Sequence, residues 1–236
     1  MKSPANLAYI LPNLFTAASI FSGMLSMMSA INGDFSKAAW LIFLSLLFDG
    51  LDGRVARLTN TSSKFGMEFD SLADIVAFGV APALLVFLYA GEDYGRLGVV
   101  ASALFVIFGA IRLARFNLMT TEPTVFIGVP IPAAAIFVTI IVLLFDKYNL
   151  KEGYGVLLLV ATIVASILMV TNIRYPSFKK VDTNKKHIRK IFASILFLLL
   201  LIFIYPIEGL ATLFICYILY GPIRAIFVSL TRLRKT

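Results

Sequence analysis

The sequence has little of what metal and redox sites commonly use. It contains one cysteine, Cys216, and one histidine, His187, among 236 residues. A single cysteine excludes an internal disulfide and any cysteine-rich metal site. A single histidine, placed in a basic segment, argues against a histidine-based metal centre and against a Cys/His nucleophile pair.

Charged residues are also scarce. They make up 14% of the chain, whereas soluble domains carry about 25%. Hydrophobic residues make up 60%, phenylalanine alone occurs 21 times, and the mean hydropathy is +0.92. This composition excludes an ordinary soluble domain and indicates an integral membrane protein.

Apolar runs separated by polar breaks set the organisation of the chain. Each run has about the 20 residues needed to span a bilayer. The predicted spans are 9–31, 36–53, 70–90, 97–116, 128–145, 154–172, 190–205 and 209–229. We therefore predict an all-α polytopic membrane bundle of about eight transmembrane helices, forming one domain over residues 1–236. The N-terminus lacks a convincing cleavage site, so we expect the first span to be retained.

The distribution of lysine and arginine supports this arrangement. With both termini in the cytoplasm, 17 of the 21 basic residues lie in cytoplasmic segments. Such a bias is typical of membrane proteins. We therefore predict a protein of the cell membrane with both ends inside.

The polar residues gather between the second and third spans. Asp49 and Asp52 end one span, and Asp70 and Asp74 begin the next. Spacings of three and four place both members of each pair on one helix face. Four converging carboxylates suit one or two hard divalent cations. By the predicted topology, the cluster faces the cytoplasm.

Two other interpretations of this cluster are open. Arg54 and Arg57 could neutralise the aspartates in a purely structural salt-bridge network, although four acids outnumber two cations. Intramembrane aspartates also build ion pathways, so an ion transporter is a non-enzymatic alternative. The gathering of the acids at one face, with none deep in the later spans, argues against transport.

The pattern Asp49-x2-Asp52-Gly53-x2-Ala56-Arg57-x8-Gly66-x3-Asp70-x3-Asp74 resembles the signature of the CDP-alcohol phosphotransferase family at every specified position. The resemblance implies a membrane enzyme that transfers a phosphoryl-containing group from a CDP-linked donor to an alcohol and releases CMP. It also implies a six-helix core, commonly dimeric. The helix pair in 190–236 would be an addition, and a homodimer is the expected assembly.

Three shorter segments resemble the phosphatidylserine synthase branch of this family. They are 12–16 (PNLFT), 112–117 (RLARFN) and 126–135 (FIGVPIPAAA). The donor would then be CDP-diacylglycerol and the acceptor L-serine. The same transfer to glycerol 3-phosphate or inositol phosphate is the alternative, because the sequence alone does not define the acceptor pocket.

The resemblance also assigns roles to residues. It implies that Asp49, Asp52 and Asp70 hold the metal, Mg²⁺ or Mn²⁺, with Asp74 as a further ligand and the general base. The four carboxylates leave room for two ions that share one of them. The residues expected to bind the CDP-lipid are Gly53, Ala56, Arg57, Ser63, Gly66, Asn13 and Thr16. Helix capping is an equally good account of Asn13 and Thr16, since both residue types favour helix starts.

Basic residues outside the signature form two further groups. Arg112 and Arg115 end the fourth span beside Asn117, and we expect these three residues to contact the acceptor or the lipid-linked phosphate. Arginine offers a planar fork that matches a carboxylate. The alternative is that both arginines only anchor the end of the helix at the membrane interface. The basic segment 174–190 indicates attraction to anionic lipid headgroups, and no binding module accompanies it that would indicate nucleic acid.

Overall fold

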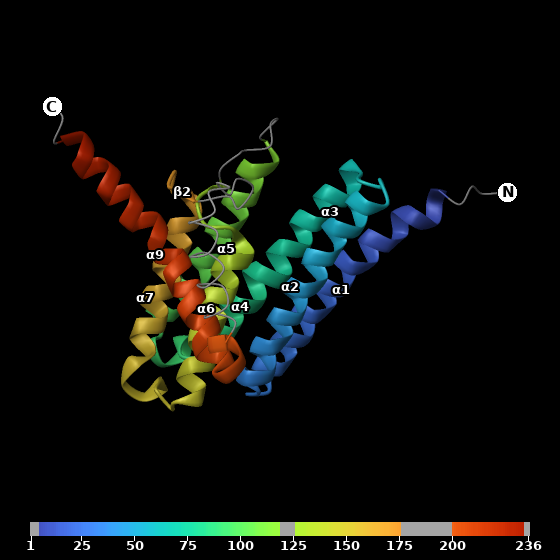
Figure 1. The fold of residues 1–236 in the computed structure, drawn as a ribbon. Helices are drawn as coiled ribbons and strands as arrows, with labels where there is room; N and C mark the ends of the chain where they lie inside the picture. The colour runs from blue at the N-terminus through green and yellow to red at the C-terminus, as the bar shows by residue number, and fades with distance from the viewer. Residues whose placement is uncertain (1–4, 119–125, 176–199, 234–236) are drawn as a thin grey trace.

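The computed structural model describes residues 5–118, 126–175 and 200–233. Its first two helices, α1 (Ala5–Ile31) and α2 (Phe35–Leu58), form an antiparallel hairpin along one side of the molecule (Figure 1). The turn between them contains Gly33 with φ of +82°, a left-handed conformation that glycine adopts without strain. This hairpin carries the first half of the acidic cluster.

The third span is built from three helical pieces in succession. They are α3 (Lys64–Asp74), the π-helical segment η1 (Ile75–Val80) and α4 (Ala81–Tyr89). Gly23 of α1 allows close approach to η1, since a Cβ at this glycine would lie 3.0 Å from the Cα of Ala77. The hairpin and the third span are therefore packed backbone to backbone just below the aspartates.

The remaining elements complete the bundle. A 3₁₀ turn, η2 (Gly91–Tyr94), leads into α5 (Arg96–Asn117). Helices α6 (Ile131–Lys147) and α7 (Lys151–Val170) follow, and α9 (Pro206–Leu233) ends the chain. The two-residue strands β1 (Phe126–Ile127) and β2 (Arg174–Tyr175) pair in antiparallel register and join the start of α6 to the end of α7. Helix content agrees with the all-α prediction; this short ladder is the exception.

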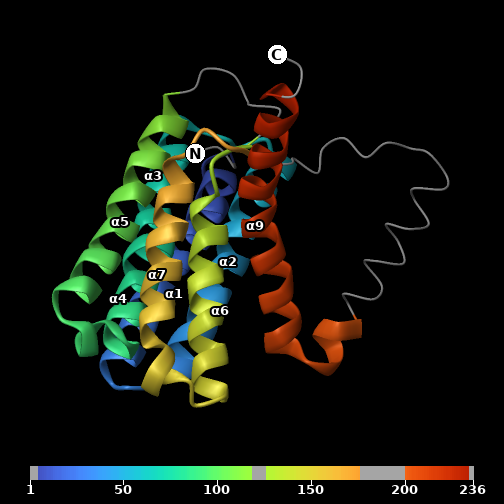
Figure 2. The ribbon, with the colours of Figure 1, turned by 90° about the vertical axis from the view of Figure 1, so that its left-hand side faces the viewer.

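Helix α6 is the centre of the core. It lies between α7 and α9 in Figure 2, and its side chains are buried around most of its circumference. Several large apolar side chains on the outer helices are at least half exposed, among them Phe21, Leu47 and Ile107. A helix that is apolar all round sits inside a bundle, and exposed apolar side chains on the outside suit lipid.

Five of the described helical stretches are long and apolar enough to cross a membrane. They are Ile10–Ile31, Lys64–Tyr89, Arg96–Asn117, Lys151–Val170 and Pro206–Arg224. Helix α2 is long enough but carries the charged residues of the cluster, and α6 has 17 residues. The membrane-helix prediction is confirmed at this level, whereas the count of eight spans stays a prediction. Most of the predicted span 190–205, and of the basic segment 174–190, lies outside the described residues.

The boundaries of the signature differ from the expectation. Helix α2 continues to Leu58, five residues beyond the predicted end of the second span, and α3 begins at Lys64. The polar loop is therefore only 59–63. Leucine, alanine and arginine are strong helix formers, so charge by itself does not end the helix.

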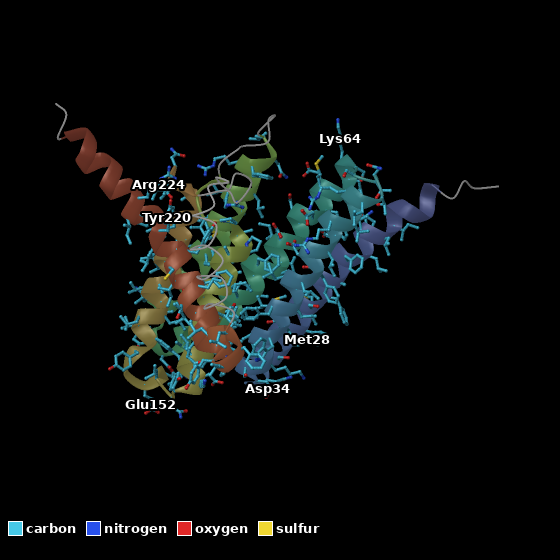
Figure 3. The ribbon with its side chains drawn as sticks, in the orientation of Figure 1. Met28, Asp34, Lys64, Glu152, Tyr220 and Arg224 are labelled. Carbon is cyan, nitrogen blue, oxygen red and sulfur yellow. The ribbon has the colours of Figure 1, made fainter. Side chains whose placement is uncertain are left out.

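The bundle has two distinct ends. Lys64 and Arg224 lie at one end, and Asp34 and Glu152 at the other (Figure 3). The acidic cluster is nearer the first end, because Asp49 and Asp52 lie toward the end of α2 and Asp70 follows Lys64 on α3. Lys64 and Arg224 belong to segments predicted to be cytoplasmic, and Asp34 and Glu152 to loops predicted to lie outside, so their positions at opposite ends agree with the predicted topology. Which side of the membrane each end faces stays a prediction.

Candidate active site

Three of the four predicted aspartates converge in space. Carboxylate oxygens of Asp49, Asp70 and Asp74 all lie within 4.8 Å of one another. Asp49 comes from α2, and the other two come from successive turns of α3. The π-helical segment begins directly after Asp74, and such segments are frequent at functional sites.

Asp52 lies beside this group, on its side toward α1. Its side chain is 6% exposed, and its Oδ2 accepts a hydrogen bond of 2.7 Å from the hydroxyl of Thr16. Asp52 also interacts with Asp70, and Asp49 with Asp74. The four carboxylates therefore form one continuous group, in which Thr16 orients Asp52.

The structure does not support the salt-bridge interpretation of the cluster. The ion pairs of Lys147 with Glu208 and of Lys151 with Asp93 involve no aspartate of the cluster. Neither Arg54 nor Arg57 pairs with an acid of the cluster. Arg57 lies in electrostatic range of Asp52, and Arg112 of Asp74, so two protein cations stand near four carboxylates without forming ion pairs with them.

The donor set fits a hard divalent cation. The Oδ1 atoms of Asp70 and Asp74 are buried and have no hydrogen-bond partner among the described residues. Buried polar atoms are almost always satisfied, so unpartnered carboxylate oxygens call for a ligand. All-oxygen, anionic donors are those that Mg²⁺ and Mn²⁺ prefer. Asp49, Asp70 and Asp74 could hold one such ion, with Asp52 available at the edge.

A cavity of about 390 Å³ opens beside the aspartates. It is enclosed by α1, α2, the loop 59–63 and α3. Its lining includes Asp52, Asp70 and every residue predicted to bind the CDP-lipid: Asn13, Thr16, Gly53, Ala56, Arg57, Ser63 and Gly66. Acids and nucleotide-binding candidates thus share one space.

Local contacts explain how several of these residues are held. The hydroxyl of Ser63 accepts a hydrogen bond of 3.0 Å from the backbone N–H of Gly66 and so caps the start of α3. A Cβ at Gly66 would lie 3.2 Å from that hydroxyl and 3.5 Å from Oδ1 of Asn13. The glycine therefore keeps this corner of the cavity open.

The helix-capping interpretation of Asn13 and Thr16 is wrong. Helix α1 begins at Ala5, so both residues lie in its interior. The hydroxyl of Thr16 donates its proton to Asp52 at 2.7 Å, and the Pro12 carbonyl oxygen lies 3.2 Å from the same hydroxyl. A further contact, between the hydroxyls of Ser19 and Ser45 at 2.7 Å, ties α1 to α2 one turn deeper. These polar contacts fix the face that α1 presents to the cavity.

The three residues predicted to contact the acceptor occupy different positions. Arg112 is 8% exposed and interacts with Asp74. Arg115 instead donates to the Val170 carbonyl and to Asn172, at the end of α7. Asn117 is exposed and hydrogen-bonds to two residues of α3, Glu68 and Ser71. Only Arg112 of the three faces the acidic cluster.

Sequence reasoning missed some of the cavity wall. Pro12, Thr61, Ser62 and Met67 line it as well. Thr61 is 7% exposed and shares a hydrogen bond of 2.7 Å with Thr59. The proximity of Pro12 to Asn13 was the available signal for one of them. Nothing in the sequence distinguishes the loop residues Thr61 and Ser62 from an ordinary polar turn.

This chain is similar to known proteins over much of its length. The sequence model of the CDP-alcohol phosphatidyltransferase family matches residues 9–170. A CDP-diacylglycerol–serine O-phosphatidyltransferase of Helicobacter pylori is 55% identical over 228 residues, which cover 95% of this chain and 94% of the relative.

More distant relatives match a shorter stretch. The protein of the same name from Bacillus subtilis is 35% identical over 170 residues, covering 72% of this chain and 92% of the relative. An archaetidylserine synthase of Methanothermobacter thermautotrophicus is 37% identical over 169 residues, covering 70% of this chain and 69% of the relative.

Proposed function

Because the chain belongs to the CDP-alcohol phosphatidyltransferase family, we propose that it transfers a phosphatidyl group from CDP-diacylglycerol to the hydroxyl of L-serine. The products are phosphatidylserine and CMP. The similarity to serine phosphatidyltransferases over almost the whole chain supports serine as the acceptor. The observation that carries the proposal is the cavity that joins the acidic cluster to the nucleotide-binding candidates.

The aspartates are the proposed ligands of Mg²⁺ or Mn²⁺. Asp49, Asp70 and Asp74 offer clustered oxygens, and Asp52 extends the set toward the cavity. When bound, a divalent cation would neutralise pyrophosphate charge and stabilise the departing CMP. The remaining task of the protein is to position donor and acceptor, which dominates catalysis of phosphoryl transfer.

Asp74 is the proposed general base. The serine hydroxyl oxygen attacks the β-phosphorus of the donor, and the bond from that phosphorus to the oxygen of CMP breaks. Asp74 accepts the hydroxyl proton as the new P–O bond forms. Its Oδ1 is buried and unpartnered, so it is available for this role. A weak but well-placed base suffices when the proton moves in concert with attack.

The donor headgroup is proposed to occupy the cavity between α1, α2 and α3. Thr16, Gly53 and Ala56 give it a small-residue wall, and the exposed Arg57 supplies positive charge for phosphate. Exposed apolar side chains elsewhere on α1, including Leu14 and Phe21, suit contact with lipid. The acyl chains of the donor can therefore stay in the bilayer while its headgroup reaches the acids.

A leucine at Gly53 should obstruct this cavity. Overfilling a packed site costs about 1–3 kcal/mol, so Gly53→Leu should raise the KM for CDP-diacylglycerol by about tenfold or more. Gly50→Leu is the matched control, because Gly50 lies one turn earlier on α2 and a Cβ there meets nothing within 4 Å. Equal KM values for the two variants would place the donor elsewhere.

Two features of assembly and placement complete the proposal. The end of the bundle that carries the cluster faces the cytoplasm, supported by the lysine and arginine bias in the sequence. A homodimer is proposed from family membership.

The function is tested with the purified protein in vesicles containing CDP-diacylglycerol, with Mg²⁺ or Mn²⁺. CMP release is measured with L-serine, glycerol 3-phosphate or inositol phosphate as acceptor. We expect CMP release that depends on serine and forms phosphatidylserine. Release driven by either phosphorylated acceptor and not by serine would contradict the acceptor assignment.

A further inference from the structure

The side chain of Asn117 joins the end of α5 to α3. Its Nδ2 donates to Oε2 of Glu68 at 3.3 Å and to the hydroxyl of Ser71 at 3.1 Å. An ionised carboxylate only accepts hydrogen bonds, so the nitrogen of the amide, and not its oxygen, must lie toward Glu68. Glu68 and Ser71 are three residues apart, so one amide bridges about a full turn of α3.

This bridge connects two parts of the bundle. In Figure 1, α3 lies with α1 and α2, whereas α5 lies with α6 and α7. The end of α5 is itself fixed by Arg115, two residues before Asn117. Arg115 donates to the Val170 carbonyl at 3.2 Å and to Oδ1 of Asn172 at 3.3 Å. Helix α3 is therefore tied through Asn117 to a helix end that is anchored on α7.

The bridge lies beside the acidic cluster but on another face of α3. Asp70 and Asp74 bring carboxylate oxygens within 4.8 Å of Asp49 on α2. Ser71 follows Asp70 in the sequence and is turned from it by about 100° around the helix axis, toward α5. A rotation of α3 about its axis would therefore separate Ser71 from Asn117 and, at the same time, turn the two aspartates away from Asp49.

The other surfaces of α3 give this rotation little support. Phe65 and Leu72, on the side away from the bridge and the cluster, are 68% and 65% exposed in the described part of the chain. Toward α1 the helix presents Gly66, which has no side chain to interlock. After Asp74 the π-helical segment η1 interrupts the regular α-helix, so the orientation of α4 in the core is not carried directly into α3.

We propose that Asn117 is a positioning residue of the acidic cluster. Its bridge to Glu68 and Ser71 holds α3 in the rotation that directs Asp70 and Asp74 at Asp49. This inference rests on the cation site of the proposed function and deepens it. Asn117 acts on the ligands of the cation through α3 and does not itself contact the acceptor.

Replacing Asn117 by aspartate tests the bridge with almost no change of shape. Asn117→Asp removes the donor and sets a carboxylate against Glu68. We expect Mn²⁺ to bind the purified, substrate-free protein about tenfold more weakly, the loss typical of a hydrogen bond to a charged group. An added carboxylate would by its charge alone attract a cation, so weaker binding identifies altered geometry. Binding is followed by the electron paramagnetic resonance signal of free Mn²⁺.

A second substitution should reverse this loss. Adding Glu68→Gln to Asn117→Asp places a donor opposite the new acceptor, so Mn²⁺ affinity should return to within about threefold of the wild type. Glu68→Gln alone should match the wild type, because its amide oxygen can still accept from Asn117. Asn149→Asp is the matched control, on an exposed asparagine in the turn between α6 and α7, and should also match the wild type.

The outcomes separate the inference from the proposed function. Wild-type Mn²⁺ affinity in Asn117→Asp, or no recovery on adding Glu68→Gln, overturns the inference. So does a raised KM for serine with unchanged Mn²⁺ binding, which would place Asn117 against the acceptor. If Asn117→Asp does not fold, Ser71→Ala removes the other partner without adding charge and should weaken Mn²⁺ binding by about threefold; unchanged binding then overturns the inference. A wild-type protein that binds no Mn²⁺ would remove the proposed cation site together with it.

Discussion

Replacing Asp74 by asparagine should lower serine-dependent CMP release by about a thousandfold or more, since a positioned general base contributes about 10²–10⁴ in rate. Asparagine has nearly the shape of aspartate but cannot accept the hydroxyl proton. It also removes one anionic oxygen from the group that Asp74 forms with Asp49 and Asp70. Turnover is followed by CMP release at saturating donor and acceptor.

A measurement of CDP-lipid binding distinguishes loss of the general base from loss of the donor site. Asp74 does not line the cavity proposed for the CDP headgroup, so Asp74→Asn should still bind a CDP-lipid. Retained binding would also show that the variant is folded. Asp146→Asn, an exposed aspartate at the opposite end of the bundle, is the control and should behave as the wild type. An active Asp74→Asn protein would eliminate Asp74 as the base.

Removing divalent cations should abolish turnover. A bound cation supplies several kcal/mol of transition-state stabilisation, which corresponds to a loss of more than about a hundredfold. Exhaustive chelation followed by Mg²⁺ or Mn²⁺ should therefore switch activity off and on. Undiminished CMP release in excess chelator would contradict a metal-dependent mechanism.

Cation binding has a second readout that does not depend on activity. Like charges at short distance destabilise the fold, and a ligand that binds only the folded state raises its stability. Addition of Mn²⁺ to the chelated protein should raise the Tm, and Asp70→Asn should reduce that rise. Asp34→Asn, on an exposed residue of the α1–α2 turn, should leave it intact. An equal rise in both variants would place the ion away from the cluster.

Much of this architecture could be predicted because it depends on short-range patterns. The lengths of the apolar runs predict membrane helices, and spacings of three and four place acid pairs on a helix face. Asp70 and Asp74 on α3 follow that expectation directly. Most signature residues also line the cavity, because the signature covers two adjacent helices and the short loop between them.

Other features depend on contacts between helices that are far apart in the sequence. Arg112 and Arg115 are equivalent in the sequence, yet one faces Asp74 and the other the end of α7. Thr16 meets Asp52 across 36 residues, a contact that overrides the capping interpretation. Helical periodicity defines which residues share a face, but it does not define which neighbour that face meets.

The sequence by itself determined the class of protein, the helical character of its spans and the pairing of the acids, because each depends on composition or on spacing within one helix. Tertiary structure alone decided that Thr16 of α1 orients Asp52 and that Arg112, unlike Arg115, lies on the side of Asp74. The rotation of each helix about its axis is set by packing against its neighbours, such as Gly109 against Ile131 and Gly23 against Ala77. Such packing is a property of the whole bundle and cannot be read from any one segment.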